Sequence, residues 1–102
     1  QRQMCKETGD NTFIGHVAGL NNTTGNFSIY IGTAAGEQVT TANSNIFLGY
    51  LAGRYNTSGG NSIVLGSNAA IGPSGGYNLG ANSVIIGTSA GASTTSGSTG
   101  IS

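Results

Sequence analysis

Five times along this chain an aliphatic residue is followed directly by a glycine, and these steps are almost evenly spaced. They are Ile14-Gly15, Ile31-Gly32, Leu48-Gly49, Leu65-Gly66 and Ile86-Gly87, with intervals of 17, 17, 17 and 21 residues between the glycines. A fixed period of this length is typical of a solenoid, in which each repeat forms one coil that stacks on its neighbours. We therefore predict a solenoid of about five coils with a 17-residue repeat.

The repeat favours strands over helices. The chain contains 19 glycines, and each one inside a helix would cost about 1 kcal/mol relative to alanine. The residues three and one before each key glycine are Thr12 and Ile14, Ile29 and Ile31, Ile46 and Leu48, Ile63 and Leu65, and Val84 and Ile86. This period of two predicts a short β-strand with the paired residues facing the interior. A second interior position is predicted at the alanine three residues after the glycine, namely Ala18, Ala35, Ala52, Ala69 and Ala90.

Between each predicted interior pair lies one residue that the same alternation places on the outside. These residues are all apolar: Phe13, Tyr30, Phe47, Val64 and Ile85. Stacked strands lie about 4.8 Å apart, so these side chains would form an exposed ladder, and exposed apolar patches usually mark contact surfaces. We predict a trimer or contact ladder here; the alternative is that such residues simply favour strands.

Composition excludes several classes of function. Only 6% of the residues are charged and the formal net charge is zero, so no electrostatic surface for nucleic acid is predicted. No apolar stretch reaches the roughly 18 residues that a membrane span requires. One histidine and three carboxylates cannot supply a repeated calcium site or a nucleophile, base and stabiliser together. We expect no enzyme activity, metal or cofactor, and we expect His16 to be a solvated corner residue.

The repeat defines three segments. Residues 1–9 carry half of the charged residues and form a lead-in segment, residues 10–91 form the solenoid, and residues 92–102 are a terminal segment rich in Ser, Thr and Gly. The long fourth interval contains four additional residues, Tyr77, Asn78, Leu79 and Gly80. Insertions in solenoids form loops that often bind ligands, so this loop is a candidate receptor site; the alternative is a tolerated decoration.

Two polar ladders accompany the repeat. Eight residues beyond the key glycines lie Thr23, Thr40, Thr57, Ser74 and Thr95. A regular row of hydroxyl groups resembles the surfaces of ice-binding proteins, although Ser and Thr are also ordinary turn residues. Asparagines at Asn11, Asn45, Asn61 and Asn82 are predicted to stack and cap corners inside the structure.

The strand motif and the linkers carry a resemblance to known repeats. Asn61-Ser62-Ile63-Val64-Leu65-Gly66 and Asn82-Ser83-Val84-Ile85-Ile86-Gly87 resemble the head repeats of YadA-type trimeric autotransporter adhesins. Asn11 to Gly19 and Asn22 to Gly25 look like the repeats of phage and large-virus tail fibres. The resemblance implies a left-handed parallel β-roll, a side-by-side homotrimer, and a place outside the cell, on a cell or virion surface. The adhesin repeat is shorter, and its residue between the paired positions is usually small.

Taken together, these features predict a structural attachment module. It would form the head or shaft of a trimeric fibre and present a surface that binds a host glycan or protein, without nucleic acid and without insertion into a membrane. Such a module needs only repeated weak contacts multiplied by valency. A pure fibre spacer and an ice-binding solenoid are the alternatives.

Overall fold

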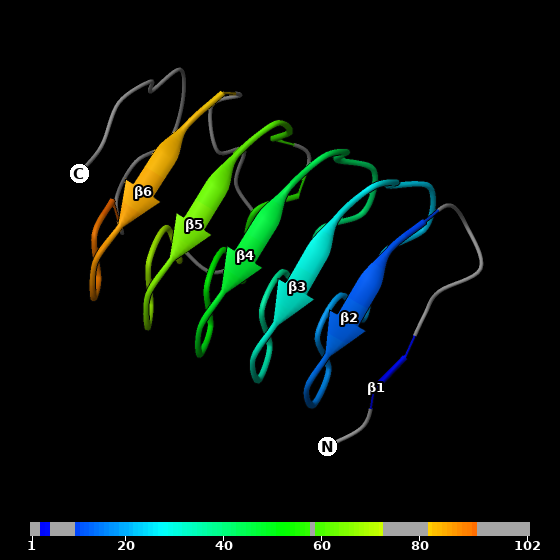
Figure 1. Cartoon of the computed structure of the whole chain (residues 1–102), viewed down its shortest axis with the longest axis horizontal. Coiled ribbons are helices and arrows are strands. Elements are labelled where there is room, and N and C mark those ends of the chain that lie inside the picture. The colour runs from blue at the N-terminus through cyan, green and yellow to red at the C-terminus, as the bar shows by residue number, and fades with distance from the viewer. Residues whose placement is uncertain (1–2, 5–9, 58, 73–81, 92–102) are drawn as a thin grey trace.

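The computed structural model describes residues 3–4, 10–57, 59–72 and 82–91. Its strands are β1 (Gln3–Met4), β2 (Thr12–Ile14), β3 (Ile29–Ile31), β4 (Ile46–Leu48), β5 (Ile63–Leu65) and β6 (Val84–Ile86). They form one sheet in the order of the chain. Figure 1 shows β2 to β6 side by side, with the chain turning back behind the sheet between successive strands. The all-β solenoid predicted from the repeat is confirmed.

The strands stack in the register that the repeat predicts. From β2 to β6 every pairing is parallel, and each residue lies beside its equivalent in the next coil, as Phe13 does beside Tyr30. Ile63 on β5 pairs with Val84 on β6, so the longer interval leaves the strand register intact. At the other end β1 runs antiparallel to β2 and covers its outer edge.

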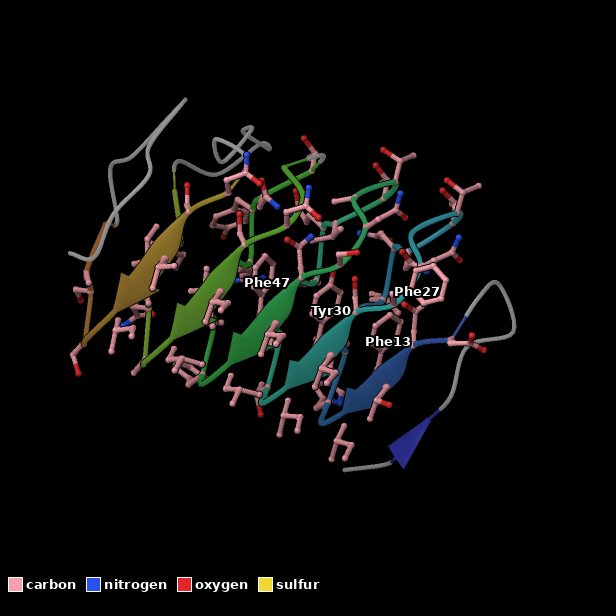
Figure 2. The ribbon with its side chains drawn as sticks, turned by 45° about the horizontal axis from the view of Figure 1, so that its top comes forward. Phe13, Phe27, Tyr30 and Phe47 are labelled. Atoms are coloured by element: carbon pink, nitrogen blue, oxygen red, sulfur yellow. The ribbon has the colours of Figure 1, made fainter. Side chains whose placement is uncertain are left out.

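The interior of the coil is the reverse of the sequence prediction. The middle residue of each parallel strand is the buried one, and the flanking residues face outward (Phe13, Tyr30, Phe47, Val64 and Ile85 are 0–2% exposed). Phe13 and Tyr30 stack with ring centroids 4.8 Å apart, and Tyr30 and Phe47 with centroids 5.0 Å apart. Figure 2 shows these three rings in a row behind the strands. The prediction of an exposed contact ladder at these five positions is therefore wrong.

The physical reason for the reversal is the size of the coil interior. Most of the other core residues are alanines: four of the five repeat alanines are buried and Ala90 packs partly buried against the core, while Val39 and the partly buried Tyr55 are the larger additions. The second glycine of the motif leaves room for the ring, because a Cβ on Gly19 would lie 2.6 Å from the Phe13 ring. One large side chain per coil fills this space, so two aliphatic side chains per strand must point outward. The alanine prediction is confirmed.

The key glycines allow neighbouring coils to approach closely. Gly49 has φ +135°, a conformation that residues with a Cβ rarely adopt. A Cβ on Gly49 would also lie 2.6 Å from the carbonyl oxygen of Gly66 in the next coil. The glycines that end β2 to β5 are thus required both for their own backbone angle and for the stacking distance, whereas Gly87, at the end of β6, meets no such carbonyl.

A polar ladder runs inside the corner that precedes the strands. The side chain at this position accepts a hydrogen bond from the backbone N–H of its equivalent in the next coil: Asn11 Oδ1 from Ser28 (2.9 Å), Ser28 Oγ from Asn45 (3.2 Å), Asn45 Oδ1 from Ser62 (2.9 Å) and Ser62 Oγ from Ser83 (3.3 Å). Asn11 and Asn45 are buried as predicted. Asn61 and Asn82 lie one position earlier and are exposed, so their assignment to an internal ladder is wrong.

Candidate functional site

The largest candidate site is the outward surface of the parallel sheet, here called the strand face. Nine of its ten side chains are aliphatic and none is charged; they are Thr12, Ile14, Ile29, Ile31, Ile46, Leu48, Ile63, Leu65, Val84 and Ile86. Because equivalent residues pair across the sheet, they form two straight aliphatic ladders. With strands about 4.8 Å apart, the strand face extends about 20 Å along the stack.

The strand face is substantially exposed. Ile31 is 38% exposed and Ile86 is 46% exposed, although isoleucine is among the residues most often buried in proteins. The strand positions between them in the stack, such as Leu48 and Leu65, are half-buried by their neighbours. A continuous apolar surface of this kind is a candidate interaction site. The sequence prediction missed it because it placed these same residues in the core.

The predicted contact ladder has no access to a partner. Phe13, Tyr30 and Phe47 are 0% exposed, and Val64 and Ile85 are buried with them. The Tyr30 hydroxyl is itself buried and, within the described part of the chain, has no hydrogen-bond partner. Burial raises the pKa of Tyr30, and the nearby side chains of Ser28 and Asn45 oppose this effect only in part. These residues belong to the core and not to a binding surface.

Within the described residues, the predicted hydroxyl ladder links each coil to the next. The Thr23 hydroxyl donates to the carbonyl oxygen of Thr40 (3.0 Å), and the Thr40 hydroxyl donates to that of Thr57 (3.3 Å). A hydroxyl held by the next coil cannot donate the same proton to water or ice, so these contacts favour a structural role. Ser74 and Thr95 lie outside the described residues, as do Tyr77, Asn78, Leu79 and Gly80 of the candidate receptor loop.

The few charged side chains do not assemble into a reactive centre in the described ranges. Arg54 pairs with Glu37 of the neighbouring coil at 2.5 Å, and its guanidinium lies 4.9 Å from the centre of the Tyr55 ring. This pairing raises the pKa of Arg54, which remains a cation. His16 is exposed, as predicted. Among residues 10–57, 59–72 and 82–91, no three His, Cys, Asp or Glu side chains come close enough to hold a metal ion.

The search for a membrane-spanning element is negative for the part of the chain that the structure describes, where no helix has the length and apolar character required. Comparison of the chain with protein-family models, with curated proteins and with solved structures finds no match.

Proposed function

We propose that this chain is an attachment module, the head or shaft of a trimeric fibre of the YadA-like or tail-fibre kind. In this proposal the copies pack side by side through their strand faces, on a cell or virion surface. The outer corners and loops remain free to contact a host-surface glycan or protein. The observation that carries the proposal is the exposed, uncharged aliphatic strand face.

A second copy of the same chain is the partner that fits the strand face best. The ladders of one copy repeat at the strand spacing of about 4.8 Å, and a second copy offers aliphatic side chains at that same interval along the whole strand face. Burial of aliphatic surface contributes about 25 cal/mol per Å², and no charge on the strand face opposes it. The resemblance to trimeric head repeats supports three copies, arranged as a closed ring of the kind that symmetric oligomers form.

Assembly would also give attachment its strength. A contact made by a single corner is weak, but three linked copies convert the second and third contacts into intramolecular events, which can raise the overall affinity by about 10² to 10⁴. The shape of the solenoid repeats each exposed corner along the stack and around the trimer. Attachment by this route needs no chemical step.

The test is binding of the fluorescently labelled chain to a panel of host cells, compared with Ile31→Lys. A lysine at this exposed strand-face position would separate the copies without entering the core, so adhesion should fall at least tenfold. Thr24→Lys is the matched control, because Thr24 is exposed but lies off the strand face. If the wild-type chain assembles but adheres to no cell, attachment is wrong and the module is a fibre spacer.

A further inference from the structure

Phe27 combines a backbone angle that is unfavourable for a bulky residue with an apolar side chain that is exposed to solvent. Its φ is +59°, in the left-handed region that a bulky residue rarely occupies. Its side chain is 64% exposed. Figure 2 shows the ring outside the ribbon at the tail of β3, whereas the rings of Phe13, Tyr30 and Phe47 lie inside. Val17 and Leu51 also have a positive φ, at 52° and 62°, so this angle belongs to the corners of the coil. Phe27 is set apart by its exposure, which is the highest of the large apolar side chains in the described residues.

The other coils show that this corner does not require an aromatic residue. The equivalent positions carry small or polar residues: Asp10, Ser44, Asn61 and Asn82. Ser44, Asn61 and Asn82 share the positive φ of Phe27, at 60°, 56° and 64°, and asparagine is among the residues best suited to it. The corner can thus be built without the ring, and the ring must have another use.

The corner holds Phe27 in a fixed position. The N–H of Asn26, the preceding residue, donates to Asn43 Oδ1 at 2.7 Å, and the Asn26 carbonyl accepts from the Ser44 N–H at 2.9 Å. On the other side, the Ser28 N–H donates to Asn11 Oδ1 at 2.9 Å. Hydrogen bonds to the coils below and above therefore secure both neighbours of Phe27. An exposed ring whose backbone is held by these hydrogen bonds is preorganised for binding.

The flanking positions define the chemistry of the partner. The 17-residue period makes Asp10 the equivalent of Phe27 in the coil before it and Ser44 the equivalent in the coil after it, two residues ahead of strands that pair in register. Both residues are exposed. The corner thus carries an exposed aromatic ring in one coil, a carboxylate in the coil before it and a hydroxyl in the coil after it. A pyranose ring has the complementary surface, with an apolar C–H face to lie on the aromatic ring and hydroxyl groups to donate to the carboxylate.

We propose that Phe27 is the stacking platform of a saccharide subsite that Asp10 and Ser44 complete. The proposal rests on the attachment function above and names its ligand class as a glycan. The equivalents of Phe27 in the flanking coils are polar, whereas Ile29, two residues along the chain and also exposed, belongs to the strand face. A sugar unit can use the ring together with the polar groups on either side of it, while a protein partner would need several anchors in a wider desolvated patch. One ring between two polar groups matches the size of a single sugar unit.

The test uses a printed array of neutral and acidic oligosaccharides and the variant Phe27→Asn, which copies the residue of Asn61 and Asn82 at this corner. The variant should fold and melt at the same or a higher temperature, because asparagine tolerates the positive φ. Its saccharide binding should fall by about tenfold or more, the effect of losing a binding hot spot. Leu20→Asn is the control, because it removes another exposed apolar side chain and should leave binding unchanged.

Each other outcome overturns the subsite. Unchanged array binding by Phe27→Asn would show that the ring does not contact the sugar. A change in its oligomeric mass would make Phe27 a contact between copies. A wild-type chain that binds no saccharide on the array, but still adheres to cells after periodate oxidation of their glycans, would exclude a glycan ligand and leave attachment through protein standing.

Discussion

Replacing Phe47 by alanine tests which face of the strand is the interior. Phe47 is 0% exposed, stacks on Tyr30 with centroids 5.0 Å apart, and packs so closely that a Cβ on Gly53 would lie 2.5 Å from its ring. Truncation therefore leaves a cavity that glycine and alanine neighbours cannot fill. The matched variant is Leu48→Ala, one residue along the same strand but on the half-buried strand face.

The two substitutions should differ widely in magnitude. Phenylalanine-to-alanine changes in a protein core cost about 3 to 5 kcal/mol, which is a large part of the 5 to 15 kcal/mol that typically stabilises a domain. Leu48→Ala removes only partly buried surface and creates no internal cavity, so it should cost about 1 kcal/mol. The predicted difference between the two variants is about 2 to 4 kcal/mol.

The assay is urea unfolding followed by circular dichroism, with both alanine variants made in the Ile31→Lys background. The lysine background keeps chain association out of the comparison, so that each midpoint reports the stability of one solenoid. With a slope of about 1 to 3 kcal/mol per molar urea, Phe47→Ala should lower the midpoint by 1 M or more. Equal losses for Phe47→Ala and Leu48→Ala, or a larger loss for Leu48→Ala, would refute the assignment of the rings to the interior.

Two further predictions concern close packing and the buried hydroxyl. Gly49→Ala should destabilise the fold by several kcal/mol more than Gly87→Ala. Both glycines have φ near +130°, so both variants carry backbone strain of about 1 to 3 kcal/mol, but only a Cβ at position 49 would meet the carbonyl of the next coil, at 2.6 Å from Gly66. Equal losses of stability in thermal unfolding would contradict the inter-coil contact. Tyr30→Phe should leave the free energy of unfolding unchanged or raise it by about 1 kcal/mol, because the hydroxyl is buried without a partner among the described residues. Burial raises the pKa of Tyr30 above its usual 10.0, so the unfolded chain ionises first, and the wild type should lose stability relative to Tyr30→Phe as the pH rises above 10. A loss of more than about 1 kcal/mol at neutral pH would indicate a hydrogen bond at that hydroxyl.

The period of the repeat predicted the fold well because stacking requires regular spacing. Glycines 17 residues apart placed each strand correctly, and the alanine after each one proved to be interior. The four additional residues before Asn82 did not disturb the pairing of β5 with β6. Backbone hydrogen bonds between coils depend on the length of the repeat and on the geometry of its turns, and the spacing of the glycines in the sequence shows both.

The choice of the inner face could not be made from alternation alone. When both faces of a strand are apolar, a period of two separates the faces but does not say which is buried. Side-chain volume carried the missing signal. The second glycine of the motif follows each of Phe13, Tyr30, Phe47 and Ile85, and it is replaced by Ala70 only in the coil with Val64, the smallest of the five core residues. The room that the larger core side chains need explains this correlation.

The exposed corner at Phe27 could not be predicted from the sequence for a different reason. Phe27 occupies the first residue of a repeat whose consensus at that point is Asn or Ser, and a single departure carries no period. The sequence shows neither the positive φ of Phe27, which Ser44, Asn61 and Asn82 share, nor the exposure of its ring. Both quantities depend on how the turn is closed by Asn43 and Ser44 of the next coil.

Light scattering coupled to size-exclusion chromatography is the most direct test of the proposal that copies assemble through the strand face. At micromolar concentration the wild-type chain should have three times the 10.1 kDa mass of one chain. Ile31→Lys should have the mass of one chain with an unchanged circular dichroism spectrum, while Thr24→Lys should remain a trimer. A wild-type mass of one chain, or an Ile31→Lys variant that still forms trimers, would contradict the account.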